Sequence, residues 1–228
     1  MATIGDNLQA VKNRIARAAE QARRDPAALV LLAVSKGQPA ARIEEARAAG
    51  QAAFGENYVQ EAIAKMEVLP RLEWHLIGPL QSNKTRAVAE RFDWVQTVAS
   101  EKIARRLSEQ RPSGMGPLNV LIQMNVSGEA SKSGVAPKDA LPLCEKVLEL
   151  KNLRLRGLMA IPEPGAPRER FREVRTVYER LKERFGFDTL SMGMSDDLEL
   201  AIAEGATLVR VGTAIFGARI QPAARSAA

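Results

Sequence analysis

The sequence has 228 residues, a length that fits one barrel-sized α/β domain better than two small domains, each of which would bury little surface. Hydrophobic residues make up 46% and charged residues 26%, as in soluble globular proteins, and no apolar run is long enough to span a membrane. The net charge of +6 comes from helices that interleave Arg with Glu, and only 4% of residues are aromatic, which argues against nucleic-acid binding.

The first segment predicts an amphipathic helix, because Thr3 and Asp6 have capping-box spacing and apolar residues then recur every 3.6 positions. This start does not resemble a secretory signal, so we expect a cytoplasmic protein. Short apolar runs then alternate with longer amphipathic runs that have helical spacing. The predicted strands span residues 29–35, 52–55, 73–78, 93–98, 119–126, 155–161, 189–195 and 207–212.

Eight strands that alternate with helices predict a (β/α)8 TIM barrel of the α/β class, with one extra helix at the N-terminus. An open, doubly wound sheet is the competing architecture, but no Gly-x-Gly-x-x-Gly follows the first strand. We expect one domain over residues 1–228, with a core at about 5–217 and a flexible tail at 218–228.

Lys36 follows the first apolar run, at the end of the barrel where function gathers. Strand alternation puts Val30, Leu32, Val34 and Lys36 on one face. If that face points inward, burial disfavours the charged ammonium and leaves neutral amine that can attack a carbonyl. The competing interpretation is a strand-end lysine that reaches solvent.

The last two predicted strands carry residues suited to a phosphate. Ser195 ends one strand and precedes a helix, and Gly212 and Thr213 follow the final strand. Arg210 shares a strand face with Gly212 and needs a partner if it is buried. Asp196 has capping-box spacing with Glu199. A lysine opposite a phosphate site suits a phosphorylated aldehyde, and pyridoxal 5′-phosphate is the obvious candidate.

Five sequence blocks closely resemble the pyridoxal phosphate homeostasis proteins, which are single-domain relatives of the alanine racemase barrel. The resemblance covers about residues 5–217, and the blocks are AVSK, FGENYVQEA, WHLIGPLQSNK, SMGMSDD and VRVGTAIFG. It implies fold type III of the pyridoxal phosphate proteins, without the C-terminal β-domain of the racemases. The sequence departs from some relatives just after Lys36. Another basic residue often follows the lysine in those relatives, whereas here the sequence reads KGQP.

The resemblance also implies a set of site residues. Lys36 would carry the cofactor as a Schiff base, Arg210 would lie near the pyridine nitrogen, and Asn57 would lie beside the cofactor. His75, the only histidine, falls in a matching motif, although the residues slightly favour a satisfied strand histidine over a cofactor contact. The cofactor-binding set is therefore Lys36, Asn57, His75, Met194, Ser195, Arg210, Gly212 and Thr213.

We expect a carrier that stores, buffers or delivers pyridoxal phosphate rather than an enzyme, because an arginine beside the ring nitrogen makes the ring a poorer electron sink. A racemase or lyase that depends on pyridoxal phosphate is the first alternative, and a Schiff-base aldolase or a nucleic-acid binder follows. Apoenzymes that need the cofactor are the candidate partners, and the expected state is a monomer or a weak dimer.

Two further residues, Lys132 and Cys144, carry reactive groups outside this set. Lys132 lies in a small-residue loop on the same rim, where a second cofactor site competes with a simple solvated loop. Cys144, the only cysteine, lies among leucines and valines and is expected to pack in the core. A single Cys and a single His exclude an internal disulfide and a site built on several of these ligands.

Overall fold

The computed structural model describes residues 2–128 and 133–218. Lys132 and the tail from residue 219 onward lie outside the described residues, so the expectations made for them are not addressed by the structure.

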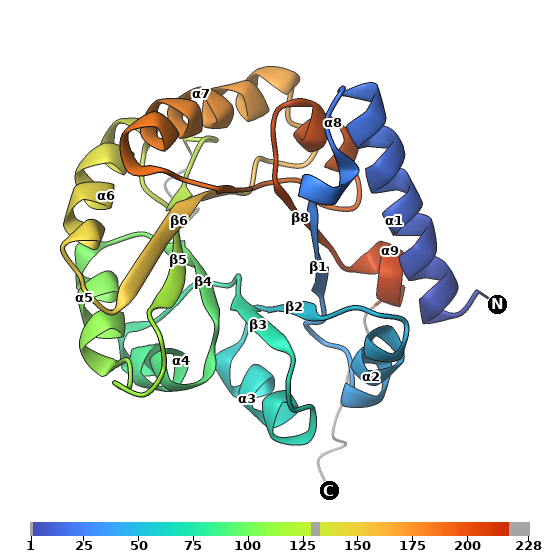
Figure 1. The fold of residues 1–228 in the computed structure, drawn as a ribbon, viewed down its shortest axis with the longest axis horizontal. Helices are drawn as coiled ribbons and strands as arrows, with labels where there is room; N and C mark the ends of the chain where they lie inside the picture. Colours follow the sequence, from blue (N-terminus) through green and yellow to red (C-terminus); the bar gives the residue numbers. More distant parts are fainter. Residues whose placement is uncertain (1, 129–132, 219–228) are drawn as a thin grey trace, which may run out of the picture.

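The eight predicted strands form a closed parallel barrel in which each strand pairs with the next one in the chain and β8 pairs with β1. The helices surround this ring of strands (Figure 1). The barrel prediction is therefore confirmed and the open sheet is excluded. The strands are β1 (Val30–Val34), β2 (Ala53–Glu56), β3 (Glu73–Leu76), β4 (Trp94–Val98), β5 (Leu118–Met124), β6 (Leu153–Ala160), β7 (Thr189–Ser191) and β8 (Leu208–Val211).

Each strand is followed by a helix, and one additional helix precedes β1. Three single turns of 3-10 helix lie at Pro26–Ala28, Ser82–Lys84 and Pro137–Asp139. The α-helices are α1 (Ile4–Gln21), α2 (Ala40–Ala48), α3 (Val59–Val68), α4 (Thr85–Arg91), α5 (Glu101–Gln110), α6 (Ala140–Leu148), α7 (Arg168–Phe185), α8 (Leu198–Ala203) and α9 (Thr213–Phe216).

Alternation along the strands divides the core into an outer and an inner part. The outer part joins the helices to the strands and includes Ala33, Phe54 and Leu76. Inside the barrel, the described residues form two smaller apolar clusters: one contains Leu32, Ala53, Ile77 and Leu208, and the other contains Trp94, Leu121 and Met159. Val34 packs against the first of these clusters, so the strand face that carries Leu32 and Val34 points inward, which is the condition set for the interpretation of Lys36.

The extra helix α1 begins as predicted. The Thr3 hydroxyl accepts a hydrogen bond from the Asp6 amide, and the Asp6 carboxylate accepts one from the Thr3 amide. Its apolar stripe packs against α8 and α9, the two helices that follow the last strands (Figure 1). The helix thus braces the part of the barrel rim where the phosphate site was predicted.

The seventh strand is shorter than predicted and ends at Ser191, so Ser195 lies in a loop. Gly193 turns the chain out of the sheet with a φ of +98°, and a Cβ atom there would lie 2.5 Å from the Ala201 Cβ. The predicted capping box at Asp196 is wrong. Helix α8 begins at Leu198, and Asp197, not Asp196, accepts a hydrogen bond from the Met194 amide at 2.5 Å.

Candidate functional site

Lys36 lies two residues beyond the end of β1, at the end of the barrel formed by the C-termini of the strands. Its side chain is half-buried, and Gly37 follows with a φ of +71°, a left-handed conformation that glycine adopts easily. The chain therefore turns away directly after the lysine, which leaves the amine at the barrel mouth.

A cavity of about 230 Å³, called the mouth cavity below, brings together residues from both ends of the sequence. Seven of the eight residues predicted to bind a cofactor line it, and His75 does not. The lining residues are Val34, Lys36, Asn57, Ile77, Ile161, Met194, Ser195, Asp196, Arg210, Gly212 and Thr213.

Arg210 reaches the mouth cavity from inside the barrel and is only 3% exposed. Its guanidinium donates to Ser191 Oγ at 2.6 Å and to the carbonyl oxygen of Ala160 at 2.9 Å. Burial lowers the pKa of Arg210 to about 10, an effect that Asp197 opposes, so the group keeps its charge at neutral pH. The mouth cavity thus has a fixed cation at its base.

The loop with Ser195 and the start of α9 form the wall next to Arg210. Helix α1 holds both segments, since Arg14 donates to the carbonyl oxygen of Ser195 at 3.1 Å and Asn7 donates to that of Ile215 at 3.0 Å. Hydroxyl groups and backbone amides on this wall suit an anion, although the exposed Asp196 carboxylate also lines the cavity.

A buried charged cluster holds the backbone on both sides of Lys36, and the sequence analysis missed it. Lys65 on α3 donates to Glu56 Oε1 at 2.6 Å, to Glu61 Oε1 at 2.6 Å and to the carbonyl oxygen of Ser35 at 2.8 Å. Glu61 also accepts the Gly37 amide at 2.6 Å. Desolvation raises the pKa of Glu56, while Lys65 opposes the rise.

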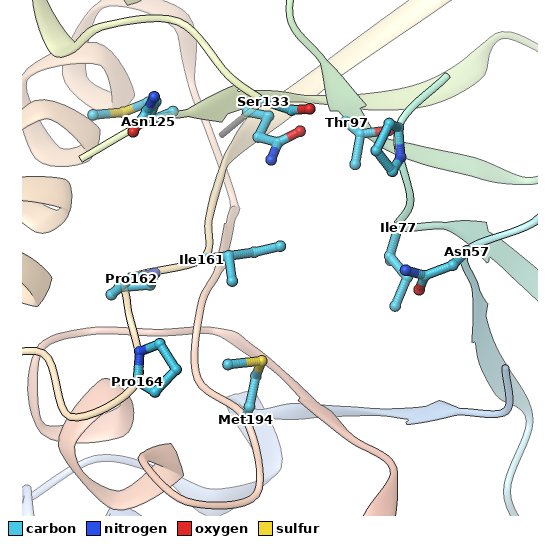
Figure 2. A pocket seen from close by; sticks show the side chains of 12 residues that line it. Asn57, Ile77, Thr97, Asn125, Ser133, Ile161, Pro162, Pro164 and Met194 are labelled. Atoms are coloured by element: carbon cyan, nitrogen blue, oxygen red, sulfur yellow. The ribbon is translucent and has the colours of Figure 1, made fainter. Parts of the chain in front are cut away.

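Asn57 borders a second cavity, called the side cavity, of about 290 Å³. Figure 2 shows Asn57 and Ile77 on one side of this space, with Ile161 and Met194 facing them. These four residues also line the mouth cavity, so the two spaces adjoin. Asn57 Oδ1 is buried and has no hydrogen-bond partner within the described residues, which leaves one acceptor at this border for a ligand.

His75 lies at the opposite end of the barrel. It borders a cavity of about 390 Å³, called the floor cavity, whose lining includes the first residues of five strands: Val30, Glu73, Trp94, Thr189 and Leu208. The predicted contact between His75 and a ligand at the mouth therefore has no geometric support. The ring stacks on Trp94, with centroids 5.0 Å apart.

Two other classes of site receive no support. Within the described residues, no three His, Cys, Asp or Glu side chains gather in a way that could hold a metal ion. Over the same ranges, no helix combines the length and apolar character needed to cross a bilayer.

Comparison with known proteins places this geometry in a family. Residues 7–220 match the family described as alanine racemase, N-terminal domain. The pyridoxal phosphate homeostasis protein of Pseudomonas aeruginosa is 60% identical over 226 residues, which cover 96% of this chain and 97% of that protein. The chain belongs to the pyridoxal phosphate homeostasis protein family. The Escherichia coli K12 member is 52% identical over 229 residues, or 96% of this chain and 98% of that protein.

The chain is also similar to PipY of Synechococcus elongatus, whose structure was solved with PLP bound. It has a TM-score of 0.76 and 40% identity to this chain, and the match covers 89% of this chain and all of that one. A relative at 40% identity therefore has the same fold as this chain.

Proposed function

We propose that this chain holds pyridoxal 5′-phosphate at the barrel mouth and takes part in its intracellular homeostasis as a carrier rather than as a catalyst. The observation that carries the proposal is the mouth cavity, where Lys36 and the wall of Ser195, Gly212 and Thr213 border one space. The family membership and the PLP-bound relative support the same ligand.

The residues present fit this cofactor. Lys36 would bond to its aldehyde carbon, Ser195, Gly212 and Thr213 would hold its phosphate, and Arg210 would lie near its ring nitrogen. The unpartnered Asn57 Oδ1 offers a further polar contact beside the ring. When bound, the cofactor supplies an aldehyde that reacts with amines and a ring that stabilises carbanions.

A carrier is favoured because the described linings of the mouth and side cavities contain no Tyr, His or Cys to serve as a second acid or base, and their one carboxylate, Asp196, is exposed on the wall beside Ser195. Tyr58 is 64% exposed at the start of α3, and burial raises the pKa of Tyr178 to about 12 in the outer layer. The alternative, a racemase or lyase, is favoured by one observation: the side cavity offers room for an amino acid next to the mouth cavity.

Absorption spectra and borohydride trapping test the proposal. Purified protein incubated with pyridoxal phosphate is expected to take on the absorption of a lysine-bound cofactor, and reduction should fix the cofactor on the peptide that contains Lys36. Lys36→Ala should lose both signals, whereas the control Lys102→Ala, on an exposed position of α5, should keep them. Trapping on another lysine in the wild-type protein would contradict the assignment.

A second assay separates the carrier from the enzyme. Loaded protein should leave D- and L-amino acids unchanged over many hours. Steady racemisation or decarboxylation that disappears in Lys36→Ala would establish the catalytic alternative. Transfer of cofactor from the loaded protein to an added apoenzyme would support the delivery role.

A further inference from the structure

An uninterrupted row of hydrogen-bonded polar side chains, buried except for Glu73 at its floor end, crosses the barrel interior from the floor cavity to the mouth cavity. Its links join Arg210 to Ser191 at 2.6 Å, Ser191 to Gln96 at 2.6 Å, Gln96 to His75 at 2.9 Å and His75 to Glu73 at 2.7 Å. The four residues from Arg210 to His75 are at most 3% exposed.

The row is confined by its surroundings. Two apolar clusters also occupy the barrel interior, and their one side chain with an N–H donor is Trp94, whose indole hydrogen bonds to Glu73 at the floor end of the row. Gln96 on β4 reaches Ser191 on β7, although β5 and β6 lie between these strands around the ring. Leaving a buried polar group unpaired in such a place is costly, so each member is held to its neighbours.

The chemistry at the two ends gives the row one direction. Arg210 can only donate hydrogen bonds, so Ser191 Oγ accepts one from it. The Ser191 hydroxyl in turn donates a hydrogen bond to Gln96 Oε1. The Gln96 amide nitrogen then donates to His75 Nδ1, and His75 Nε2 donates to the Glu73 carboxylate. His75 is therefore the neutral ring with its hydrogen on Nε2.

We propose that Ser191 and Gln96 are positioning residues that fix the orientation of Arg210 at the mouth and couple it, through this directed row, to His75 at the floor. The hydrogen-bonded coupling between Arg210 and His75 is independent of the proposed function. Only the response of His75 to bound cofactor rests on it. A ligand that shifts the Arg210 guanidinium would then alter the hydrogen bond that His75 Nδ1 accepts from Gln96, at the other end of the barrel.

The chain contains a reporter for this coupling, because His75 is the only histidine in the sequence. In ¹⁵N-labelled, tag-free protein, the ring nitrogens of His75 give a single set of correlations that reveal the tautomer. Without cofactor, Ser191→Ala should shift these resonances, although the Ser191 hydroxyl bonds to Gln96 and Arg210 rather than to His75. The control Ser108→Ala removes another buried serine hydroxyl outside the row and should leave them in place.

Adding pyridoxal phosphate gives the second comparison. The His75 nitrogens should shift in the wild-type protein and in Ser108→Ala, and the shift should fall by at least half in Ser191→Ala. If Ser191→Ala does not fold, Arg210→Met replaces it in the cofactor-free comparison, with the same expected shift. Circular dichroism establishes which variants are folded.

The outcomes distinguish this proposal from the proposed function. Cofactor-free spectra that are identical in the wild-type and the folded row variant would overturn the coupling. So would a wild-type spectrum that does not respond to cofactor while absorption shows full loading. If no cofactor bonds to Lys36, the proposed function fails, and the cofactor-free spectra still decide whether the row couples the two ends.

Discussion

Lys65 Nζ lies 2.8 Å from the carbonyl oxygen of Ser35, the residue that immediately precedes Lys36. The same ammonium group pairs with Glu56, and both side chains are almost fully buried, at 7% and 0% exposure. A cation on α3 therefore determines where the chain leaves β1. The stability of this cluster and the position of the Lys36 amine are expected to change together.

Replacing Lys65 with Met tests this relationship. It removes the counter-charge of buried Glu56, and breaking a buried pair from one side costs about 3–5 kcal/mol of unfolding free energy. Urea denaturation should show this loss, and the yield of borohydride-trapped cofactor on Lys36 should fall. Lys146→Met is the matched control, because its pair with Glu149 is exposed and 3.9 Å long, and it should cost less than about 1 kcal/mol. Equal losses in the two variants would contradict the prediction.

Gly78→Ala should disturb the border between the mouth and side cavities. A Cβ atom at Gly78 would lie 2.2 Å from the carbonyl oxygen of Asn57, so the backbone must move. Such overpacking costs about 1–3 kcal/mol, and we expect weaker cofactor binding as Asn57 shifts. Gly114→Ala is the control, since no atom lies within 4 Å of the added Cβ. Unchanged stability and affinity in Gly78→Ala would show that Asn57 does not need this close approach.

Cys144 should be unreactive in the folded protein. Burial in the outer layer raises the pKa of its thiol to about 12, so little thiolate forms at neutral pH. Alkylation by iodoacetamide, followed by mass spectrometry, should be negligible in buffer and complete in concentrated urea. Rapid labelling of the native protein would place this thiol nearer to solvent than α6 allows.

The contribution of His75 to stability should depend on pH in a defined direction. Desolvation lowers the pKa of His75 below its ordinary value of 6.5, although Glu73 and Asp93 oppose this effect. The unfolded chain therefore takes up a proton at a higher pH than the folded protein does, and this contribution to stability is lost as the pH falls below 6.5.

Urea unfolding of the wild-type protein and of His75→Gln at about pH 7.5 and about pH 5 measures this effect. The difference in unfolding free energy between the two proteins should shrink at the lower pH, because only the wild-type protein must bury a neutral imidazole. Lost stacking on Trp94 affects both pH values equally. A difference that stays constant would mean that His75 has an ordinary pKa in the folded state.

Much of the fold could be predicted because a barrel repeats one simple pattern. Eight apolar runs between amphipathic runs predict the strands, and alternation puts Leu32 and Val34 on one face, which the structure turns inward. The rule that function gathers at the C-terminal ends of strands then brings Lys36 and Arg210 together, as the mouth cavity shows.

The positions of His75 and Lys65 depend on three-dimensional distances that the spacing of apolar residues in the sequence does not give. The resemblance grouped His75 with the cofactor-binding residues, whereas the structure places it beside the floor cavity, because a matching motif does not show how deep a side chain lies along the barrel axis. Lys65 falls in an amphipathic helix where a lysine normally meets solvent. Its buried partner Glu56 comes from the strand before the helix, and a single sequence does not reveal that pairing.

The ring of strands joins the beginning of the chain to its end, because β1 pairs with β8 and Asn7 on α1 holds the carbonyl oxygen of Ile215. During synthesis, β1 leaves the ribosome long before β8 has been made. Until then, the edge of β1 that pairs with β8 is exposed to other nascent chains. The ligand wall beside Ser195 gains its final support only when the last helix has emerged. Shortened products that end before β8 should therefore aggregate rather than bind weakly.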